Sequence, residues 1–539
     1  MPPPRKGRAA AVIVSLAVMG SRFFGLLREQ VFAAMFGASS NMDAFLAAFQ
    51  IPNLLRDLFA EGALSTAFTT IFAKTAEKDG DAPAWRLGSL VLSTLILILG
   101  LLCLAGIAFS PLLVNATSLG FHAVPGKFEL TVYLTRILFP FILFISLAAA
   151  VMGMLNARFV FGIPALAPLS FNLVSVVGGV GLAFFLEPQA DWLHPHFTSR
   201  ALVGVAIGVL LGGLAQLTFQ LPALWRQGFR FRWRLDFRDP GLRAIGYLMG
   251  PALIAASVVE VNILVNAQFA STIDGARSWL SYAFRVIYFP IGMFGVAIAT
   301  VTLPSIARFE ANKDRVSFGR QVEEAIRLSL FMTLPTAIGI FVLAPEIVNV
   351  LYERGAFTAA STAHTAAALR AYAAGLAGYA GAKVLVPCFY ALGLPRIPLR
   401  ISLIAVLINL ALNTLLILVF RLGHVGVAAS TAGVAIVNFS QLAWRLRREV
   451  PLGALRGWIK LTLLLTAGGL LCGIGAWGVC AALEPVLPAH LAGRILRLLA
   501  GVTTGALLYA AFTWLCNIPE TRTAVRIVLA KWSRKRPTG

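Results

Sequence analysis

Apolar residues recur along the chain in long runs, and polar or charged residues separate one run from the next. A helix needs about 20 mostly apolar residues to cross the hydrocarbon core of a membrane. We count about fourteen such runs. Their approximate limits are 10–36, 42–74, 88–114, 128–157, 164–186, 201–225, 241–271, 278–307, 321–344, 360–392, 398–420, 424–444, 457–483 and 491–515. The pattern predicts an all-α polytopic membrane protein.

Lys and Arg gather in every second connection between these runs. The even-numbered connections are basic, and so are both ends of the chain, whereas the odd-numbered ones carry only isolated basic residues. The basic connections lie within 74–86, 226–243, 308–315, 396–400 and 445–448. Because cytoplasmic loops carry an excess of Lys and Arg, both termini are predicted to be cytoplasmic.

Composition narrows the function class. The formal net charge of +22 is explained by basic loops beside anionic lipid head groups, so no nucleic-acid partner is predicted. The five cysteines and six histidines show no metal-ligand spacing and no catalytic triad. A membrane-embedded transferase would need acidic residues to hold a metal, or an acid/base pair, and the connections offer neither. We therefore expect no metal, no cofactor and no enzyme activity.

Two prolines indicate an internal repeat. Pro52 and Pro290 each interrupt their run about ten residues from its start, in the second and eighth runs. Interrupted helices at corresponding places of two halves are typical of transporters with a site where the halves meet. The repeat predicts an N-terminal lobe over 1–226, a C-terminal lobe over 227–450, and two further helices with a basic tail over 451–539.

Ionisable residues lie inside several runs, where a charge at the bilayer centre costs roughly 2.5–3.5 kcal/mol. The first, second, seventh, eighth and tenth runs carry them: Arg22, Arg28, Glu29, Asp43, Arg56, Asp57, Glu61, Glu260, Arg285, Arg370 and Lys383. These charges could simply pair and hold helices together. Because arginines outnumber nearby acids at mid-membrane depth, we favour a water-filled cavity that binds an anion, since Arg offers a bidentate fork to phosphate.

Three stretches carry a family resemblance. The chain over 21–68, with NMDAFLAAFQIPNLLRDLFAEGALSTAF, closely resembles the opening of the MurJ (MviN) family of lipid II flippases, in the multidrug/oligosaccharidyl-lipid/polysaccharide exporter superfamily. The stretches YAFRVIYFPIGMFGVAIATVTLPSIAR (282–308) and KVLVPCFYALGLPRIP (383–398) resemble it too. The resemblance implies two pseudo-symmetric six-helix lobes around a central cationic cavity, plus two C-terminal helices whose groove suits a polyprenyl tail.

The resemblance also implies a function. The family moves lipid II, the undecaprenyl-pyrophosphate-linked disaccharide-pentapeptide, from the inner to the outer leaflet of the bacterial inner membrane by alternating access, for peptidoglycan synthesis and cell shape. The expected site residues fall in three groups, and of these Arg22, Arg28, Arg56, Arg285 and Asp43 are carried over from the family. The arginines Arg28, Arg56 and Arg285 are expected to bind the pyrophosphate, with Arg22 as a further cavity arginine; Asp43, Glu61, Glu260 and Lys383 are expected to shape or gate the cavity; Gly25, Pro52 and Pro290 are expected hinges.

The chain departs from its family at a few positions. Phe284 and Tyr288 flank Arg285 where relatives carry acids, and Glu260 is a substitute partner. Asn266 and Asn413 stand where some relatives carry carboxylates linked with sodium, so the choice among Na⁺, H⁺ and membrane potential as driving force stays open. Cell-wall synthesis or division proteins as partners also stay open.

Other functions remain as alternatives. A flippase for another polyprenyl-pyrophosphate-linked oligosaccharide would need the same arginines. A drug/cation antiporter of the same superfamily would favour acids and aromatics in its cavity. A structural scaffold would not need arginines at mid-membrane.

Overall fold

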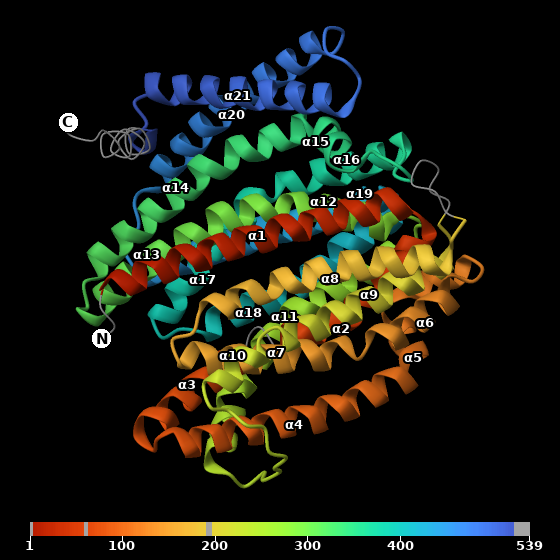
Figure 1. The fold of residues 1–539 in the computed structure, drawn as a ribbon. Helices are drawn as coiled ribbons and strands as arrows, with labels where there is room; N and C mark the ends of the chain where they lie inside the picture. The colour runs from red at the N-terminus through yellow and green to blue at the C-terminus, as the bar shows by residue number, and fades with distance from the viewer. Residues whose placement is uncertain (1–3, 59–62, 190–196, 522–539) are drawn as a thin grey trace, which may run out of the picture. The chain divides into compact units, whose positions relative to one another are not determined.

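The structure of this chain, a computed structural model, describes residues 4–58, 63–189 and 197–521. The described residues form helices and their connections (Figure 1). They divide into two compact units. Unit 1 is Met1–Ser278 with Arg354–Thr358, and unit 2 is Trp279–Glu353 with Ala359–Gly539.

Unit 1 holds the helices of the first half of the chain. They are α1 (Pro4–Phe36), α2 (Ser40–Arg56), α3 (Ala63–Lys78), α4 (Asp81–Ala108), α5 (Ser110–Ser118), the 3₁₀ turn η2 (Leu119–Ala123), α6 (Lys127–Leu138), α7 (Phe141–Ala157), α8 (Gly162–Leu186), α9 (Ser199–Thr218), α10 (Leu221–Arg226) and α11 (Pro240–Ser271). The chain passes from unit 1 to unit 2 inside α12 (Ala276–Pro290), between Ser278 and Trp279.

Unit 2 holds the remaining helices. They are the rest of α12, the π-helical turn η3 (Ile291–Val296), α13 (Ala297–Ala311), α14 (Arg315–Val342), α15 (Ala344–Tyr352), α16 (Ala359–Ala374), α17 (Leu376–Ala391), α18 (Arg396–Asn413), the π-helical turn η4 (Thr414–Val419), α19 (Gly423–Glu449), α20 (Leu455–Leu483) and α21 (Leu491–Leu515).

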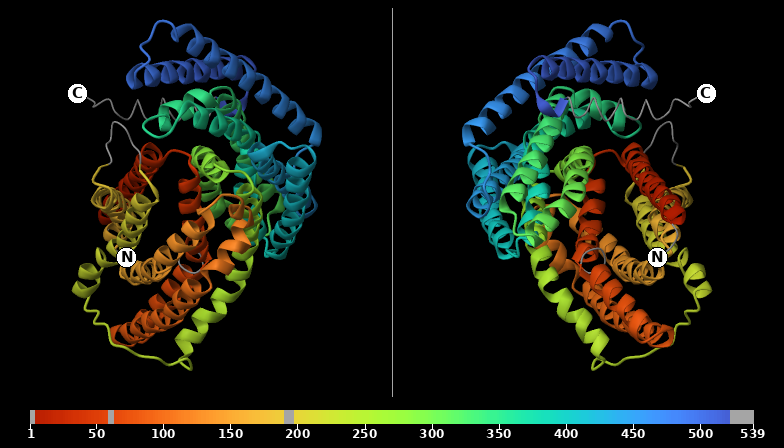
Figure 2. Two further views of the ribbon diagram at one scale, coloured as in Figure 1. Left: turned by 90° about the vertical axis from the view of Figure 1, so that its right-hand side faces the viewer. Right: turned by 90° about the vertical axis from the view of Figure 1, so that its left-hand side faces the viewer.

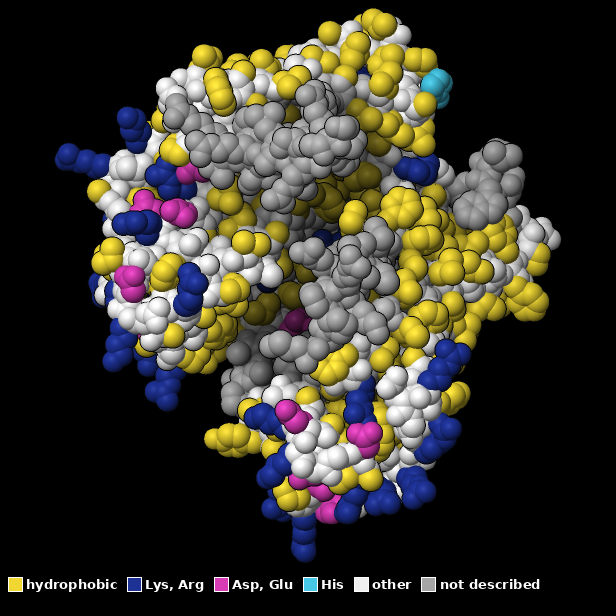
Figure 3. Space-filling view, turned by 60° about the vertical axis from the view of Figure 1, so that its left-hand side comes forward, with side chains coloured by type: hydrophobic (Ala, Val, Ile, Leu, Met, Phe, Trp, Pro, Cys, Tyr) yellow, Lys and Arg dark blue, Asp and Glu magenta, His cyan; other side chains and the backbone are white. Residues whose placement is uncertain are grey.

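Ten helical stretches among the described residues are long and apolar enough to cross a membrane. This confirms the prediction of an all-helical polytopic membrane protein. The other expected spans coincide with α1, with α2 followed by α3, with α11, and with α16 followed by α17. Large hydrophobic side chains cover much of the molecular surface (Figure 3), as a lipid-facing surface requires.

In unit 1 the even-numbered connections lie together at one end. Arg158, between α7 and α8, forms an ion pair of 2.5 Å with Asp81 and lies 4.8 Å from the ring centroid of Trp85, both at the start of α4. The Trp85 ring in turn lies 5.6 Å from that of Phe229, which follows α10. Three even-numbered connections thus meet, as the predicted up-and-down course of the chain requires.

The odd-numbered connections of unit 1 meet one another as well. Lys127, which ends the third connection, pairs with Asp43 just after the first and with Asp274 in the seventh. Unit 2 repeats the arrangement: Arg494, after the thirteenth connection, pairs with Glu353 in the ninth at 3.4 Å. The observed contacts within each unit therefore follow the predicted up-and-down course of the chain.

The two prolines that indicated an internal repeat both stand where regular α-helical hydrogen bonding is interrupted. Pro52 lies near the end of α2, and π-type bonding follows at 57–58. Pro290 ends α12, and the π-helical turn η3 follows directly. Proline removes a donor from the helix ladder, and π-type turns accommodate such a break. The hinge role of Pro52, Pro290 and Gly25 stays a prediction; Gly25 itself lies within the continuous helix α1.

Small residues let the helices of unit 1 approach closely. A Cβ added to Gly208 of α9 would clash with the backbone of Gly179 on α8. Backbone contact through small residues is typical of helix pairs in membranes, where apolar burial alone gives no driving force. The units divide the chain at Ser278 by packing, whereas the repeat boundaries at 226 and 450 stay a prediction.

Candidate functional site

Charged residues of unit 1 fall into two sets with different surroundings. The first set joins residues far apart in the sequence and is buried except for Asp274, whose side chain is 52% exposed. We call it the Asp43 cluster; it comprises Asp43, Lys127, Asp274, Arg277 and Ser278. The second set consists of arginines paired with the next residue in the chain.

Asp43 is the centre of its cluster and is fully buried. Lys127 Nζ lies 2.9 Å from Asp43 Oδ2 and 2.6 Å from Asp274 Oδ1. Gly275 N donates to Asp43 Oδ2 at 2.8 Å, and Ser278 donates to Oδ1 through its backbone N at 2.8 Å and its hydroxyl at 2.7 Å. The Asp43 carboxylate thus caps the first turn of α12, where helix N–H groups lack partners and the dipole favours an anion.

Arg277 completes this cluster. Its guanidinium donates to Gln50 Oε1 at 2.9 Å, to Ser118 Oγ at 2.8 Å, and to the backbone oxygens of Thr117 and Ala267. A buried charge is tolerated when partners satisfy it in this way. The cluster ties α2, α5, α6 and α11 to the start of α12.

Sequence reasoning identified Asp43 but did not assign a role to Lys127, Asp274, Arg277 or Ser278. A signal was available: Lys127 and Arg277 are isolated basic residues in connections otherwise poor in them, and each stands at the start of a helix.

The pKa of Asp274, which lies in a connection, is lowered. Partial burial alone would raise it, but the hydrogen bond and charge of Lys127 outweigh that effect.

The second set lies on α1 and at the end of α2. Arg28 Nη2 lies 3.0 Å from Glu29 Oε1, and Arg56 Nη2 lies 2.7 Å from Asp57 Oδ1. These described ion pairs join sequence neighbours, so they cannot themselves tie one helix to another. Glu260 on α11 lies within electrostatic range of Arg56 and Asp57. Arg56 therefore has acids beside it within unit 1.

Aromatic and amide side chains of α8 surround Arg28 and its helix. The guanidinium carbon of Arg28 lies 5.3 Å from the ring centroid of Phe171. About two turns before Arg28 on α1, Ser21 O accepts a hydrogen bond of 3.2 Å from Asn172 Nδ2, and the Asn172 side chain also lies against Gly25, one turn before Arg28. Phe171 and Asn172 thus fix the face of α1 that carries Arg28.

The remaining site residues lie as follows. Arg22 on α1 is exposed, and Glu61 lies outside the described residues. In unit 2, Arg285 on α12 and Lys383 on α17 are exposed. Phe284, beside Arg285, packs against Tyr372 and Tyr379 with ring centroids 5.2 and 6.1 Å apart. Aromatic residues therefore stand beside Arg285, as the sequence departure indicated.

Asn266 and Asn413, which stand where some relatives carry sodium-linked carboxylates, lie in different units. In unit 2, Asn413 Nδ2 donates to Asn409 Oδ1 at 3.0 Å, and Ser430 Oγ donates to the same oxygen at 2.9 Å. Asn266 lies on α11 in unit 1. The described residues contain no group of three or more His, Cys, Asp or Glu that could hold a metal ion.

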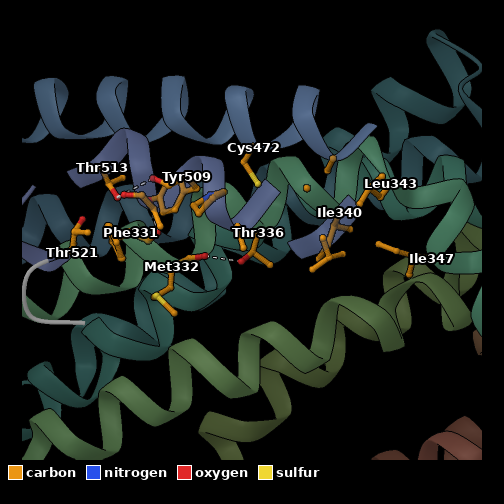
Figure 4. Close-up of a pocket in the computed structure, with 16 residues that line it drawn as sticks. Phe331, Met332, Thr336, Ile340, Leu343, Ile347, Cys472, Tyr509, Thr513 and Thr521 are labelled. Carbon is orange, nitrogen blue, oxygen red and sulfur yellow. Dashed lines mark hydrogen bonds between the residues drawn. The ribbon is translucent and has the colours of Figure 1, made fainter. Parts of the chain in front are cut away.

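Unit 2 also contains an apolar pocket of about 420 Å³ between α14, α15, α20 and α21 (Figure 4). Met332, Ile340, Ile347 and Cys472 point into it. Sequence reasoning expected a groove at the last two helices, and α14 and α15 supply the rest of this wall.

The hydroxyl groups in the wall of this pocket are bonded to the backbone. Tyr509 donates to Phe331 O at 2.7 Å, Thr336 to Met332 O at 2.7 Å, and Thr513 to Tyr509 O at 2.9 Å. These three hydroxyls are satisfied internally, which leaves the buried hydroxyl of Thr521 as a polar group of the lining without a described hydrogen bond, in a wall that is otherwise suited to an apolar ligand.

Comparison with known proteins places this geometry in a family. The family model described as "Lipid II flippase MurJ" matches residues 32–488. The chain is 33% identical over 474 residues to the lipid II flippase MurJ of Burkholderia cenocepacia, covering 87% of this chain and 89% of that protein. It is 35% identical over 444 residues to a probable lipid II flippase MurJ of Vibrio cholerae, covering 80% and 81%.

Solved structures agree with the sequence comparisons. A lipid II flippase MurJ in an inward closed conformation superposes with a TM-score of 0.75 at 25% identity, over 93% of this chain and 99% of that one. An inward-facing multidrug resistance MATE transporter of the MOP superfamily shares the fold with a TM-score of 0.64 at 14% identity, over 81% and 98%. The chain belongs to the MurJ family of lipid II flippases, a family of membrane transporters, as the residues over 21–68 predicted.

Proposed function

We propose that this protein carries lipid II from the cytoplasmic to the outer leaflet of the bacterial inner membrane for cell-wall synthesis. Family membership supports the substrate. The observation that carries the mechanism is the placement of Arg28 and Arg56 inside predicted spans with side chains that are partly accessible.

Arg28 and Arg56 are proposed to bind the pyrophosphate. Both are partly exposed, with 12% and 22% of the side chain accessible. An arginine that is neither fully buried nor fully solvated can exchange its carboxylate neighbour for a phosphate of higher charge, and Arg matches phosphate bidentately. Roles for Arg22, Arg285, Glu260 and Lys383 in the same process stay predictions from sequence.

The apolar pocket of unit 2 is proposed to take part of the polyprenyl tail. Its volume of about 420 Å³ lies in the range of small-molecule sites, and the two helices that follow the repeat, α20 and α21, supply about half of its wall. A tail that stays in an apolar groove avoids the cost of exposure to water while the head group crosses.

The topology is part of the same proposal. We place about fourteen spans in the membrane, with both termini cytoplasmic, because the basic connections that meet at one end of unit 1 would then face the cytoplasm. Transport is proposed to proceed by alternating access.

The test is to deplete the protein in its host and quantify lipid II on each face of the membrane. Build-up on the cytoplasmic face, reversed by the wild-type gene, is expected. Unchanged lipid II sidedness with another lipid-linked glycan trapped inside would overturn the substrate and support the alternative oligosaccharide flippase.

A further inference from the structure

The segment between α10 and α11 alternates aromatic or apolar residues with charged ones. Phe229, Phe231, Trp233, Leu235 and Phe237 stand at odd positions, and the even positions are Arg230, Arg232, Arg234, Asp236 and Arg238. We call residues 229–238 the aromatic–arginine segment. It contains no helix, and its yellow-green trace runs past the α3–α4 end of unit 1 (Figure 2).

The segment is fixed to α4 by two backbone hydrogen bonds. Arg232 N donates to Ser89 Oγ at 3.4 Å, and Arg234 N donates to Ser93 Oγ at 3.1 Å. The two serines are one helical turn apart, about 6 Å along the axis, and the two amides are two residues apart, about 6.6 Å in an extended chain. This match lets an extended segment follow one face of α4.

One aromatic residue anchors the segment. Phe229 is only 2% exposed and packs on Trp85. The aromatics that follow are outside: Phe231, Trp233 and Phe237 are 44%, 55% and 55% exposed. The fixed backbone therefore holds large apolar rings on the surface.

The arginines divide into two groups. Arg230 and Arg243 donate to backbone oxygens of the segment and its flanks, bracing it. The side chains of Arg232, Arg234 and Arg238 are exposed and make no hydrogen bond or ion pair with the residues that the structure describes. Asp236 Oδ1 accepts from Arg238 N, and Asp239 caps α11, so both acids are used within the backbone.

The surroundings are basic too. Lys and Arg side chains gather at the lower end of the view in Figure 3. Arg158 and the start of α4 lie beside Phe229 through Trp85. The segment therefore adds exposed rings and cations to a face that is already positively charged.

We propose that the aromatic–arginine segment binds anionic phospholipids of the leaflet beside it, the cytoplasmic one by the topology proposed above. The rings of Phe231, Trp233 and Phe237 enter the interfacial layer, where aromatic residues concentrate. Arg232, Arg234 and Arg238 bind lipid phosphates, to which basic segments at this surface are attracted. The site goes beyond the transported lipid and is separate from Arg28 and Arg56.

The test uses the purified full-length protein, with phosphatidylglycerol and phosphatidylcholine added in detergent and bound lipids counted by native mass spectrometry. The triple variant R232Q/R234Q/R238Q should bind phosphatidylglycerol at least fivefold more weakly, with phosphatidylcholine unchanged. The matched control R308Q/K313Q/R320Q removes the same charge from exposed positions of unit 2 and should stay within twofold of the wild type.

Two further variants keep the outcome decisive. R232K/R234K/R238K keeps the charge and should retain most phosphatidylglycerol binding, whereas F231S/W233S/F237S should weaken both lipids. Equal phosphatidylglycerol binding by the Gln variant and its control would overturn the proposal. So would loss, in the Gln variant only, of an oligomer that the wild type forms, since the surface would then bind a second copy of the chain.

Discussion

Asp43 and the arginines of α1 and α2 are all charges inside predicted spans, yet their partners differ. Lys127 and Asp43 are 84 residues apart in sequence, and Ser278 is 235 residues from Asp43. Arg28 and Arg56 instead pair with the next residue. Charges that join distant elements hold the fold, whereas charges paired along one helix leave its position to other contacts.

The central ion pair of the Asp43 cluster is less accessible than the arginines of the second set. The side chains of Asp43 and Lys127 are 0% and 2% exposed, and those of Arg28 and Arg56 are 12% and 22% exposed, although Asp274 at the edge of the cluster is 52% exposed. A charge that water or a ligand can reach changes partner at small cost, while a dry, fully bonded charge does not. The comparison therefore separates a set of charges that holds helices together from the set for which we propose substrate binding.

The largest expected effect is on transport. Arg28→Ala or Arg56→Ala should abolish complementation of a depleted host, because each removes a bidentate phosphate ligand. Membrane insertion should stay normal, since the described ion pair lost in each case is local. Cell growth and protein level in the membrane are the measurements.

Two controls sharpen that result. Arg315→Ala breaks an exposed pair with Glu310 and should complement fully. Arg28→Lys should fail in part, since a point charge replaces a fork. Full growth with both alanine variants would remove Arg28 and Arg56 from the mechanism.

The next effect is on stability. Lys127→Met leaves the Asp43 carboxylate buried without its cation and should destabilise the protein by about 3 kcal/mol. The midpoint of thermal unfolding in detergent measures it. Adding Asp43→Asn in the same chain should restore part of the loss, because the buried charge is gone. A Lys127→Met protein as stable as the wild type would show that the cluster does not hold the fold.

A smaller effect is expected at the apolar pocket. Gly339 lines it, and a Cβ added there meets no atom within 4 Å. Gly339→Leu should fold normally, fill part of the pocket and lower transport several-fold. Gly478 on α20 has equal space but does not line the pocket, so Gly478→Leu is the matched control. Equal transport by both variants would argue against a lipid tail in the pocket.

The smallest effect is on pH dependence. The lowered pKa of Asp274 means that its ionised form stabilises the folded state. This contribution is complete above about pH 5, beyond the ordinary Asp pKa, and is lost as the pH falls through the lower folded-state pKa. Between pH 6 and pH 3, the midpoint temperature of thermal unfolding should therefore fall less steeply for Asp274→Asn than for the wild type. Parallel curves would contradict the Lys127–Asp274 interaction.

Much of the fold could be predicted from the sequence, because length, hydropathy and the alternation of basic connections act locally along the chain. The helical course is an example: Asp81, Arg158 and Phe229 come from three even-numbered connections and meet at one end of unit 1. The expected spans at α1, the α2–α3 pair and α11, which carry many of the charges, are not among the ten stretches found in the described residues.

The partners of those charges could not be predicted. Asp43 and Arg28 look alike in sequence, as charges at the ends or middle of apolar runs. Only the fold brings Lys127 and Ser278 to Asp43, because they lie in connections that meet through packing of α2, α6 and α12. The contribution of α14 and α15 to the pocket could not be predicted for a related reason. These helices are as apolar as many others, and only their packing on α20 and α21 forms a cavity.

Binding of lipid II by purified variants tests the central claim most directly. Native mass spectrometry with added lipid II compares how tightly the lipid binds to the wild type, Arg28→Ala, Arg56→Ala and Arg315→Ala. The comparison is made between proteins of equal thermal stability. The account predicts that the wild type and Arg315→Ala bind equally, while the other two lose at least tenfold in affinity. Unchanged lipid II binding by Arg28→Ala and Arg56→Ala would contradict it and assign those arginines to the helices that carry them.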